Sequence, residues 1–200
     1  MTFAELADQL ADHLDSEVMD VEGATYVVIP VSADIDADEV LDLRADAVAH
    51  GGFIFFAEPP TGEDDWAVGL APGTSANEAV LAVGTSGGDS GPTPAQVAAW
   101  LDEAATFGAF TVTLITPDAI GIEFEATPKD LAGLAARVHA ICPQVHADIV
   151  ELLAEGDEDL SPEAFAAELG LPADIGALTP ERVLELVFAQ DTEVLLRWVQ

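Results

Sequence analysis

The stretch from Thr127 to Val145, TPKDLAGLAARVHAICPQV, constrains the fold most, because it predicts one amphipathic helix with a defined start and end. Thr127 is expected to cap this helix, and Pro128 suits its first position. Apolar residues then recur at spacings of three and four, which places them on one face. These residues are Leu131, Leu134, Ala135, Val138 and Cys142. Pro143 is expected to end the helix, whose apolar face must pack against another element.

The rest of the chain alternates between strand-like and helix-like patterns. Runs rich in β-branched, aromatic or other apolar residues lie at 25–31, 53–57, 66–70, 110–115, 120–125 and 193–199. Helical patterns lie at 2–15, 36–50, 93–107, 127–145 and 146–154 and begin near 161 and 179, whereas 76–83 fits either type. The run at 53–57 is expected to be a central strand, and 110–125 an antiparallel hairpin. This irregular alternation predicts an α+β fold with a mixed or antiparallel sheet and helices packed on it.

Length and composition favour a single domain. The chain has 200 residues, half of them apolar, which is enough for a hydrophobic core and excludes a disordered acidic tail. Within this domain, residues 1–50 form an N-terminal helix–strand–helix part and residues 51–200 the remainder. The run EGDED at 155–159 is the sharpest break in composition and indicates an acidic insertion near 155–180.

Four segments, in this order, resemble a bacterial family of domains of unknown function, the one numbered 4253. They are LAVGTSGGDSG at 81–91, ITPDAIGIEF at 115–124, LAGLAARVHAICPQV at 131–145 and VLLRWVQ at 194–200. The closest correspondence is Cys142-Pro143 at the end of a helix, and the resemblance covers about residues 51–200. Gln144 stands where the family has an acid, and the chain ends in WVQ where the family has WWD. The resemblance implies an α/β-type fold and no catalytic residues.

Charge is the strongest feature of the composition. The chain has 38 acidic residues and only 5 lysines and arginines, so its formal net charge is −33. Binding to nucleic-acid phosphates or to anionic membranes requires basic residues, and we expect neither. Three interpretations of the acidity remain: a solubility or salt-adapted surface, a docking surface for a basic partner protein, and a mimic of nucleic acid.

The N-terminal residues argue against export. The segment MTFAELADQLADHLDSE has no basic start, and no apolar run in the chain approaches the roughly 18 residues of a membrane span. Cys142 is the only cysteine, so no disulfide can form within the chain. We therefore expect a cytoplasmic protein.

The strongest metal-binding candidates are His139, Cys142 and His146. His139 and Cys142 lie one helical turn apart, but Pro143 separates them from His146, and Cys142 belongs to the apolar stripe. Packing is therefore the favoured interpretation, and we expect no bound metal and no cofactor. The three tryptophans, Trp66, Trp100 and Trp198, are also expected to lie in the core.

The glycine-rich segment GTSGGDSGP at 84–92 predicts a loop, and Gly84, Ser86, Asp89 and Ser90 are its candidate binding residues. It resembles the nucleophile loop of trypsin-like proteases. However, His50 lies only 40 residues before Ser90, too few for the two barrels that hold such a triad. No lysine follows the loop, which disfavours a phosphate cradle. A plain connection between two elements explains the segment best.

These observations lead to one hypothesis with two alternatives. The hypothesis is a non-catalytic interaction protein whose acidic surface docks a basic partner, for example in an immunity or antitoxin-like role. The first alternative is an enzyme of unknown reaction, with a carboxylate-lined cleft near the 84–92 loop. The second is a salt-adapted domain in which the acidity serves solvation only.

Overall fold

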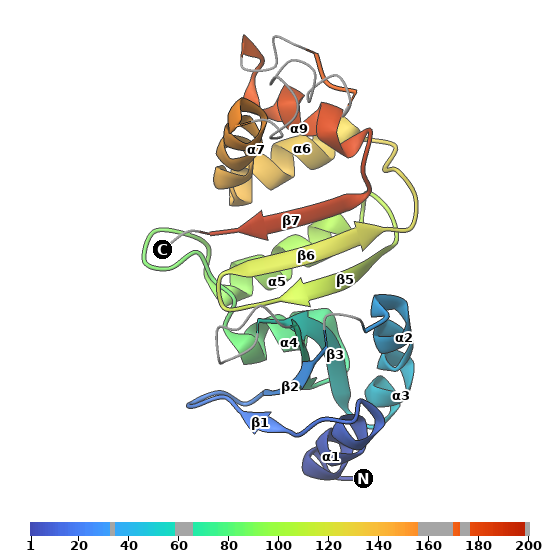
Figure 1. Cartoon of the computed structure of the whole chain (residues 1–200). Helices are drawn as coiled ribbons and strands as arrows, with labels where there is room; N and C mark the ends of the chain where they lie inside the picture. The colour runs from blue at the N-terminus through green and yellow to red at the C-terminus, as the bar shows by residue number, and fades with distance from the viewer. Residues whose placement is uncertain (33–34, 59–65, 156–169, 173–176, 199–200) are drawn as a thin grey trace.

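The apolar run at 53–57 forms the central strand, β3 (Gly52–Ala57), whose six residues are all buried. The computed structural model describes residues 1–32, 35–58, 66–155, 170–172 and 177–198 (Figure 1). In this part of the chain seven strands form one sheet, in the order β1-β2-β4-β3-β5-β6-β7. The other strands are β1 (Met19–Asp20), β2 (Val27–Val31), β4 (Trp66–Pro72), β5 (Phe110–Ile115), β6 (Ala119–Phe124) and β7 (Glu193–Arg197).

The sheet is mixed, which confirms the predicted α+β fold. All neighbouring strands are antiparallel except β3 and β5, which are parallel. The predicted hairpin at 110–125 is the pair β5–β6, and β4 pairs back onto β3 as expected. Strands β1 and β2, from residues 1–50, join the same sheet through β4.

Two helices begin at capping boxes that the sequence indicates, and one predicted cap is wrong. Capping boxes open α1 at Thr2 and Glu5 and α5 at Thr93 and Gln96, as predicted. The ambiguous segment at 76–83 is a helix, capped by Ser75. The helices are α1 (Phe3–His13), α2 (Ala37–Asp42), α3 (Arg44–Ala49), α4 (Ala76–Val83), α5 (Pro94–Ala104), α6 (Leu131–Ile141), α7 (Gln144–Glu155) and α9 (Pro180–Phe188).

The wrong cap is Thr127: the helix predicted to open at Pro128 begins three residues later, at Leu131, as α6. Asp130 is its actual cap, because its carboxylate accepts a hydrogen bond from the Gly133 N–H at 2.9 Å. Aspartate caps helices somewhat better than threonine, and Gly133 leaves room for the carboxylate, which lies 2.3 Å from where a Cβ would be. The predicted stop is correct, since α6 ends before Pro143 and α7 begins after it.

Three further expectations need comment. The helix predicted at 36–50 is two helices, α2 and α3, joined at Leu43. Trp66 is 50% exposed rather than in the core; it lies at the start of β4, where its ring meets that of Phe56 edge to face. Much of the predicted insertion at 155–180, and the helix expected near 161, lie outside the described residues.

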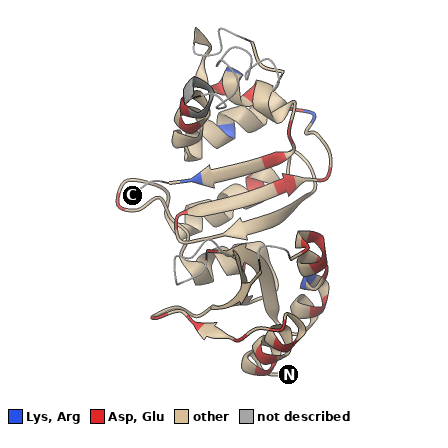
Figure 2. Ribbon diagram, in the orientation of Figure 1, with Lys and Arg blue, Asp and Glu red and all other residues tan. Residues whose placement is uncertain are grey.

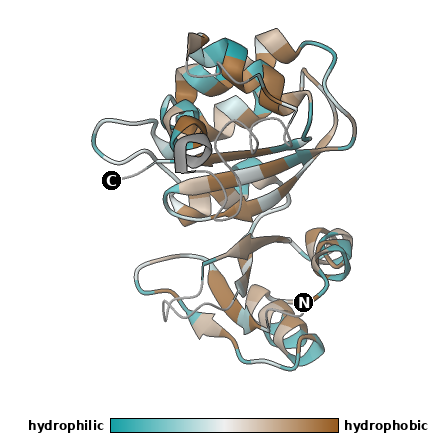
Figure 3. Cartoon of the chain, turned by 45° about the horizontal axis from the view of Figure 1, so that its top comes forward, coloured by the Kyte–Doolittle hydropathy of each residue, from teal (hydrophilic) through white to brown (hydrophobic). Residues whose placement is uncertain are grey.

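Two hydrophobic cores lie on opposite faces of the sheet. Helices α4, α5, α6 and α9 enclose the larger one, which extends along the sheet from β2 to β7. Helices α1, α2 and α3 enclose the smaller one, whose buried strand residues come only from β2, β3 and β4. Figure 3 shows hydrophobic residues on the strands and a mixture of hydrophobic and hydrophilic residues on the helices. The second layer of helices therefore covers the N-terminal half of the sheet and reaches the other half only at Leu114 of β5.

The two halves of the sheet meet at a seam between β3 and β5, where Phe56 and Leu114 are the recorded pair. Arg44 lies in this seam. Its Nε donates to the Ile54 carbonyl at 2.7 Å, and its Nη2 donates to the Val112 carbonyl at 2.6 Å. The guanidinium carbon is also 4.6 Å from the centre of the Phe53 ring. Arg44 thus satisfies carbonyls of both strands and ties α3 to the two halves of the sheet.

Burial around Arg44 lowers the pKa of its guanidinium to about 10, so it remains charged at neutral pH. In the part of the chain described here, no helix is long and apolar enough to cross a membrane.

Candidate functional site

The face of β5, β6 and β7 that lies opposite the large core is left largely uncovered by the helices of the described chain, which pack against it only at Leu114 beside β3 (Figure 1). Alternation along the strands places the following side chains on this open face. They are Thr111, Thr113, Leu114, Ala119, Glu123, Glu193, Leu195 and Arg197, with Gly121 among them. Of these, Leu114 packs against the smaller core, and Ala119, the partner of Arg197 in the register, is buried. Leu195 is 46% exposed in the middle of β7. This open face is the largest difference between the two halves of the sheet.

A groove of about 700 Å³ runs between the α2–α3 pair and the open face. Asp38 and Asp42 line it from α2, where a spacing of four residues places them on one side of the helix. Glu123 lines it from β6. The remaining lining residues are Leu41, Arg44, Ala45, Val48 and Thr111. We call this hollow the acidic groove, because three carboxylates line it from two separate elements, α2 and β6.

Two glutamates meet where the acidic groove joins the open face. Glu123 of β6 and Glu193 of β7 are paired directly opposite each other in the strand register. Asp191 lies close by, since its carboxylate accepts a hydrogen bond from the Glu193 N–H at 3.0 Å. Partial burial raises the pKa of Glu193, and repulsion from Asp191 and Glu123 raises it further. This corner of the site is strongly electronegative.

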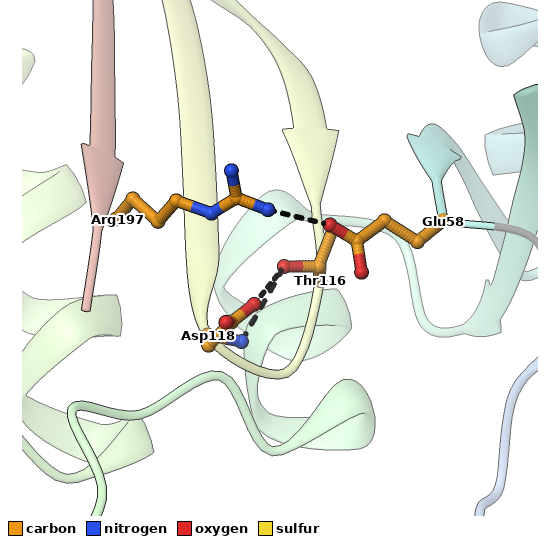
Figure 4. A network of polar contacts seen from close by, with 4 residues as sticks. All are labelled: Glu58, Thr116, Asp118 and Arg197. Carbon is orange, nitrogen blue, oxygen red and sulfur yellow. Dashed lines mark hydrogen bonds and ion pairs between the residues drawn. The ribbon is translucent and has the colours of Figure 1, made fainter. Parts of the chain in front are cut away.

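An ion pair lies across the opposite end of the open face (Figure 4). Arg197 extends from β7 across β6 toward β5, and its Nη2 donates to the Glu58 carboxylate at 3.0 Å. Beneath this pair, the Thr116 hydroxyl donates to the Asp118 carboxylate at 2.9 Å in the turn between β5 and β6. Both side chains of the ion pair are 55% exposed, so water screens their attraction.

The cations of the described chain do little to offset the acids. Arg44 is largely buried, while Arg137, Arg182 and Arg197 are paired with Glu103, Glu185 and Glu58. The fifth cation, Lys129, is exposed between β6 and α6. Figure 2 shows acidic residues on α1 and α2 and at one end of β6 and β7, with a basic residue at the other end of β7. The acidic groove therefore lies within a field that attracts cations.

A second hollow, of about 550 Å³, lies between α5 and α6 beside the 84–92 loop. Phe107, three residues beyond α5, lies against Gly133 of α6. Farther along, the small side chains of Ala99 and Ala140 line the gap between the two helices. The other lining residues are Ser90, Gly91, Pro92, Gln96, Trp100, Glu103, Arg137, Ile141, Pro143 and Trp198. This α5–α6 cleft is mainly apolar, and Glu103 is its lining carboxylate.

The four candidate residues of the predicted loop have separate surroundings. Gly84 ends α4 in the left-handed conformation, with a φ of 82°. The Ser86 N–H donates to the Pro117 carbonyl at 2.9 Å, which fastens the loop to the β5–β6 turn. Asp89 is exposed, and of the four only Ser90 lines the α5–α6 cleft.

The three metal candidates show packing contacts. Cys142 is fully buried, its thiol donates to the Arg197 carbonyl at 3.2 Å, and burial raises the thiol pKa. The rings of His139 and His146 meet edge to face, with centroids 6.4 Å apart. Within the described ranges, no group of three or more histidine, cysteine or acidic side chains is arranged to hold a metal ion.

Sequence reasoning did not single out the acidic groove. The spacing of Asp38 and Asp42 on one helical face, and the outward position of Glu123 in a hairpin, are visible in the sequence. Their convergence depends on how α2 lies across the sheet, which no local pattern encodes.

Comparison of the chain with protein-family models, with curated proteins and with solved structures found no match in any of the three. The resemblance to the family of unknown function numbered 4253 therefore stays a prediction.

Proposed function

We propose that this protein is a non-catalytic interaction module that binds a basic segment of a partner protein in the acidic groove and on the adjoining open face. The observation that carries this proposal is the convergence of Asp38, Asp42 and Glu123 on a groove beside an uncovered sheet face. An immunity or antitoxin-like role, in which the chain occupies a basic surface of another protein, is one concrete form of the proposal.

The physical argument combines shape and charge. Antiparallel sheets often leave one face in water, so exposure alone indicates nothing. Here, however, the uncovered face forms one side of a groove and carries an exposed leucine, Leu195. A net charge of −33 steers basic partners toward the molecule, and the groove offers a concave acidic surface to which they can bind.

The first test is an NMR titration of the ¹⁵N-labelled protein with a short peptide of alternating glycine and arginine, at low and moderate salt. We expect saturable shifts confined to α2, β6 and β7, which weaken as salt screens the charges. Shifts spread evenly over the exposed acids of α1 and over Glu151 of α7 would contradict the proposal, since they would indicate diffuse attraction without a site.

A matched pair of double variants sharpens this test. Asp38→Asn with Asp42→Asn neutralises the helical wall of the groove, and we expect it to weaken peptide binding at least fivefold. The control is Asp8→Asn with Asp12→Asn on α1, where two exposed acids have the same spacing and the same charge change. Equal losses in both variants would mean that net charge alone determines binding.

The salt-adaptation alternative makes a different prediction. If the acidity serves only solvation, the melting temperature should rise steeply with potassium chloride and the peptide should not bind at a defined site. A melting temperature that does not change up to molar salt would contradict that alternative.

The enzyme alternative would use the α5–α6 cleft. It is favoured by one observation: Trp100 and Trp198 line a hollow of ligand size next to Ser90 and the Glu103–Arg137 pair. Two of the three tryptophans in the chain line this cleft, so a fragment screen can follow their fluorescence. A fragment that changes the fluorescence of the native chain, but not of an Ala140→Phe variant, would favour this alternative.

A further inference from the structure

The open face of β6 and β7 carries a feature that a purely solvated face does not require. Glu123 and Glu193 are direct cross-strand neighbours, and like charges in this position destabilise a sheet. In the described chain neither carboxylate forms an ion pair, because Arg197, the cation on β7, is bound to Glu58 at the far end of the face. Folding therefore retains an electrostatic cost at this point.

The register gives neither glutamate an alternative position. Strand β6 is paired on both sides, with β5 and with β7, over most of its length. A shift of one residue would bring Glu123 to the large core and Ile122 to water, which is far more costly than the repulsion. The two carboxylates are consequently held opposite each other whether or not a cation lies between them.

An apolar contact surface lies next to the glutamate pair. Leu195 follows Glu193 by two residues on the same face and is 46% exposed. Gly121 is its partner on β6, so no side chain stands beside Leu195 on that strand. A Cβ at Gly121 would lie 2.8 Å from the Thr113 hydroxyl oxygen, so the bulge in β5 requires the glycine. The face thus offers an acidic position followed by an apolar one.

We infer that a lysine or arginine of the partner lies between Glu123 and Glu193, while an apolar residue next to it contacts Leu195. This inference rests on the proposed function, because it names the residues with which the docking surface recognises a basic segment. Charge complementarity selects the partner: a cationic side chain converts the repulsion between the two carboxylates into two attractions. Asp191 adds a third negative charge beside Glu193.

The inference predicts opposite effects of one substitution on stability and on binding. Glu193→Gln removes the repulsion in the free protein, so we expect its melting temperature to rise. The same substitution removes half of the cation site, so binding of the glycine–arginine peptide should weaken at least fivefold. A peptide of alternating valine and arginine should bind more tightly than the glycine–arginine peptide. This gain should be lost in Leu195→Thr.

Asp20→Asn is the matched control, because Asp20 is an exposed acid on β1, in the other half of the sheet, and lies far from the pair in sheet order. It should leave peptide binding within twofold of the native value. Glu123→Gln should behave like Glu193→Gln, which shows that the two residues act as a pair.

The outcomes separate this inference from the proposed function. Unchanged peptide binding in Glu193→Gln, together with weaker binding in Asp38→Asn/Asp42→Asn, would overturn the inference and leave the proposed function intact. Peptide binding that no variant alters, or no binding at all, would contradict both. Saturable NMR shifts of Glu123 and Glu193 with calcium chloride alone, abolishing peptide binding, would overturn the inference in favour of a metal site.

Discussion

The two halves of the sheet are built from similar strands but have different surroundings. In the half formed by β1 to β4, both faces are covered, and Val68 and Ala67 of β4 are fully buried on opposite faces. In the half formed by β5 to β7, one face is covered and the other is open. Leu196 of β7 is fully buried, whereas Leu195 beside it is 46% exposed. The first half stabilises the fold on two sides, while the second can offer a surface to a partner.

The strand sequences reflect this difference. The residues GFIFFA of β3 and AVGLA of β4 are continuously apolar, as expected for strands buried on both faces. The residues FTVTLI of β5 alternate with threonine, and EVLLR of β7 begins and ends with charge. Continuous and alternating patterns therefore distinguish the strands between two helical layers from those with a free face.

The largest expected contrast lies between matched aliphatic residues on the same side of the two halves. Ile54→Ala on β3 should lower the free energy of unfolding by about 2–5 kcal/mol, because Ile54 is 1% exposed under the α1–α3 layer. Leu195→Ala on the open face should lower it by less than about 1 kcal/mol. Urea denaturation measures both. A loss at Leu195 as large as that at Ile54 would mean that the face is covered in the native protein.

The next largest loss of stability is expected from a substitution in the seam between the two halves of the sheet. Arg44→Met would leave the carbonyls of Ile54 and Val112 without their donors, so we expect a loss of about 2–4 kcal/mol. Arg44→Lys should recover only part of it, since an ammonium lacks the planar fork that reaches both strands. The control, Arg182→Met, removes an exposed pair with Glu185 and should cost less than about 1 kcal/mol. If Arg44→Met lowered the free energy of unfolding as little as Arg182→Met does, the seam would not depend on Arg44.

Much of the fold could be predicted because its signals are local. The capping boxes of α1 and α5, the stop at Pro143 and the apolar runs of β3 and β4 each lie within a few residues. The predicted start of α6 was wrong because one segment contains two possible capping residues, Thr127 and Asp130, three positions apart. Local preference alone did not decide between them, and Pro128 lies buried instead of opening the helix.

The site could be predicted much less well, because its parts meet only through tertiary packing. Asp38 and Glu123 are 85 positions apart in the numbering, and they line one groove because α2 lies over the seam. The parallel pairing of β3 with β5 also has no local signal, although it determines which half of the sheet α1–α3 cover. The predicted 84–92 loop does border a cleft, but Ser90 alone of its four candidate residues lines it.

The glutamate pair on the open face should reveal itself in the pH dependence of stability. The folded pKa of Glu193 lies above its ordinary value of 4.5, so the folded state holds this proton longer than the unfolded state does. Stability should therefore fall as the pH rises from 4.5 through the folded pKa. Glu193→Gln should stabilise the protein at neutral pH by about 0.2–1 kcal/mol, a cross-strand magnitude that solvent screening reduces. Urea denaturation of the native protein and of Glu193→Gln at pH 7 and at pH 4 tests this prediction. An equal gain in the free energy of unfolding at both pH values would contradict the electrostatic explanation.

The smallest expected effect concerns the ion pair that crosses the other end of the open face. Arg197→Gln removes the contact with Glu58, but both side chains are 55% exposed, so the loss should be below about 0.5 kcal/mol and should vanish in molar salt. This substitution is informative when its effect on stability is compared with that of Arg44→Met. Both arginines link β3, or the residue that follows it, to the second half of the sheet. Arg44 donates to carbonyls in a buried seam, whereas Arg197 binds a hydrated carboxylate above the surface. The opposite outcome in urea denaturation would be a larger loss of stability for Arg197→Gln than for Arg44→Met. In that case the Arg197–Glu58 pair would hold the open face together, and the face would be a structural surface rather than one free to bind a partner.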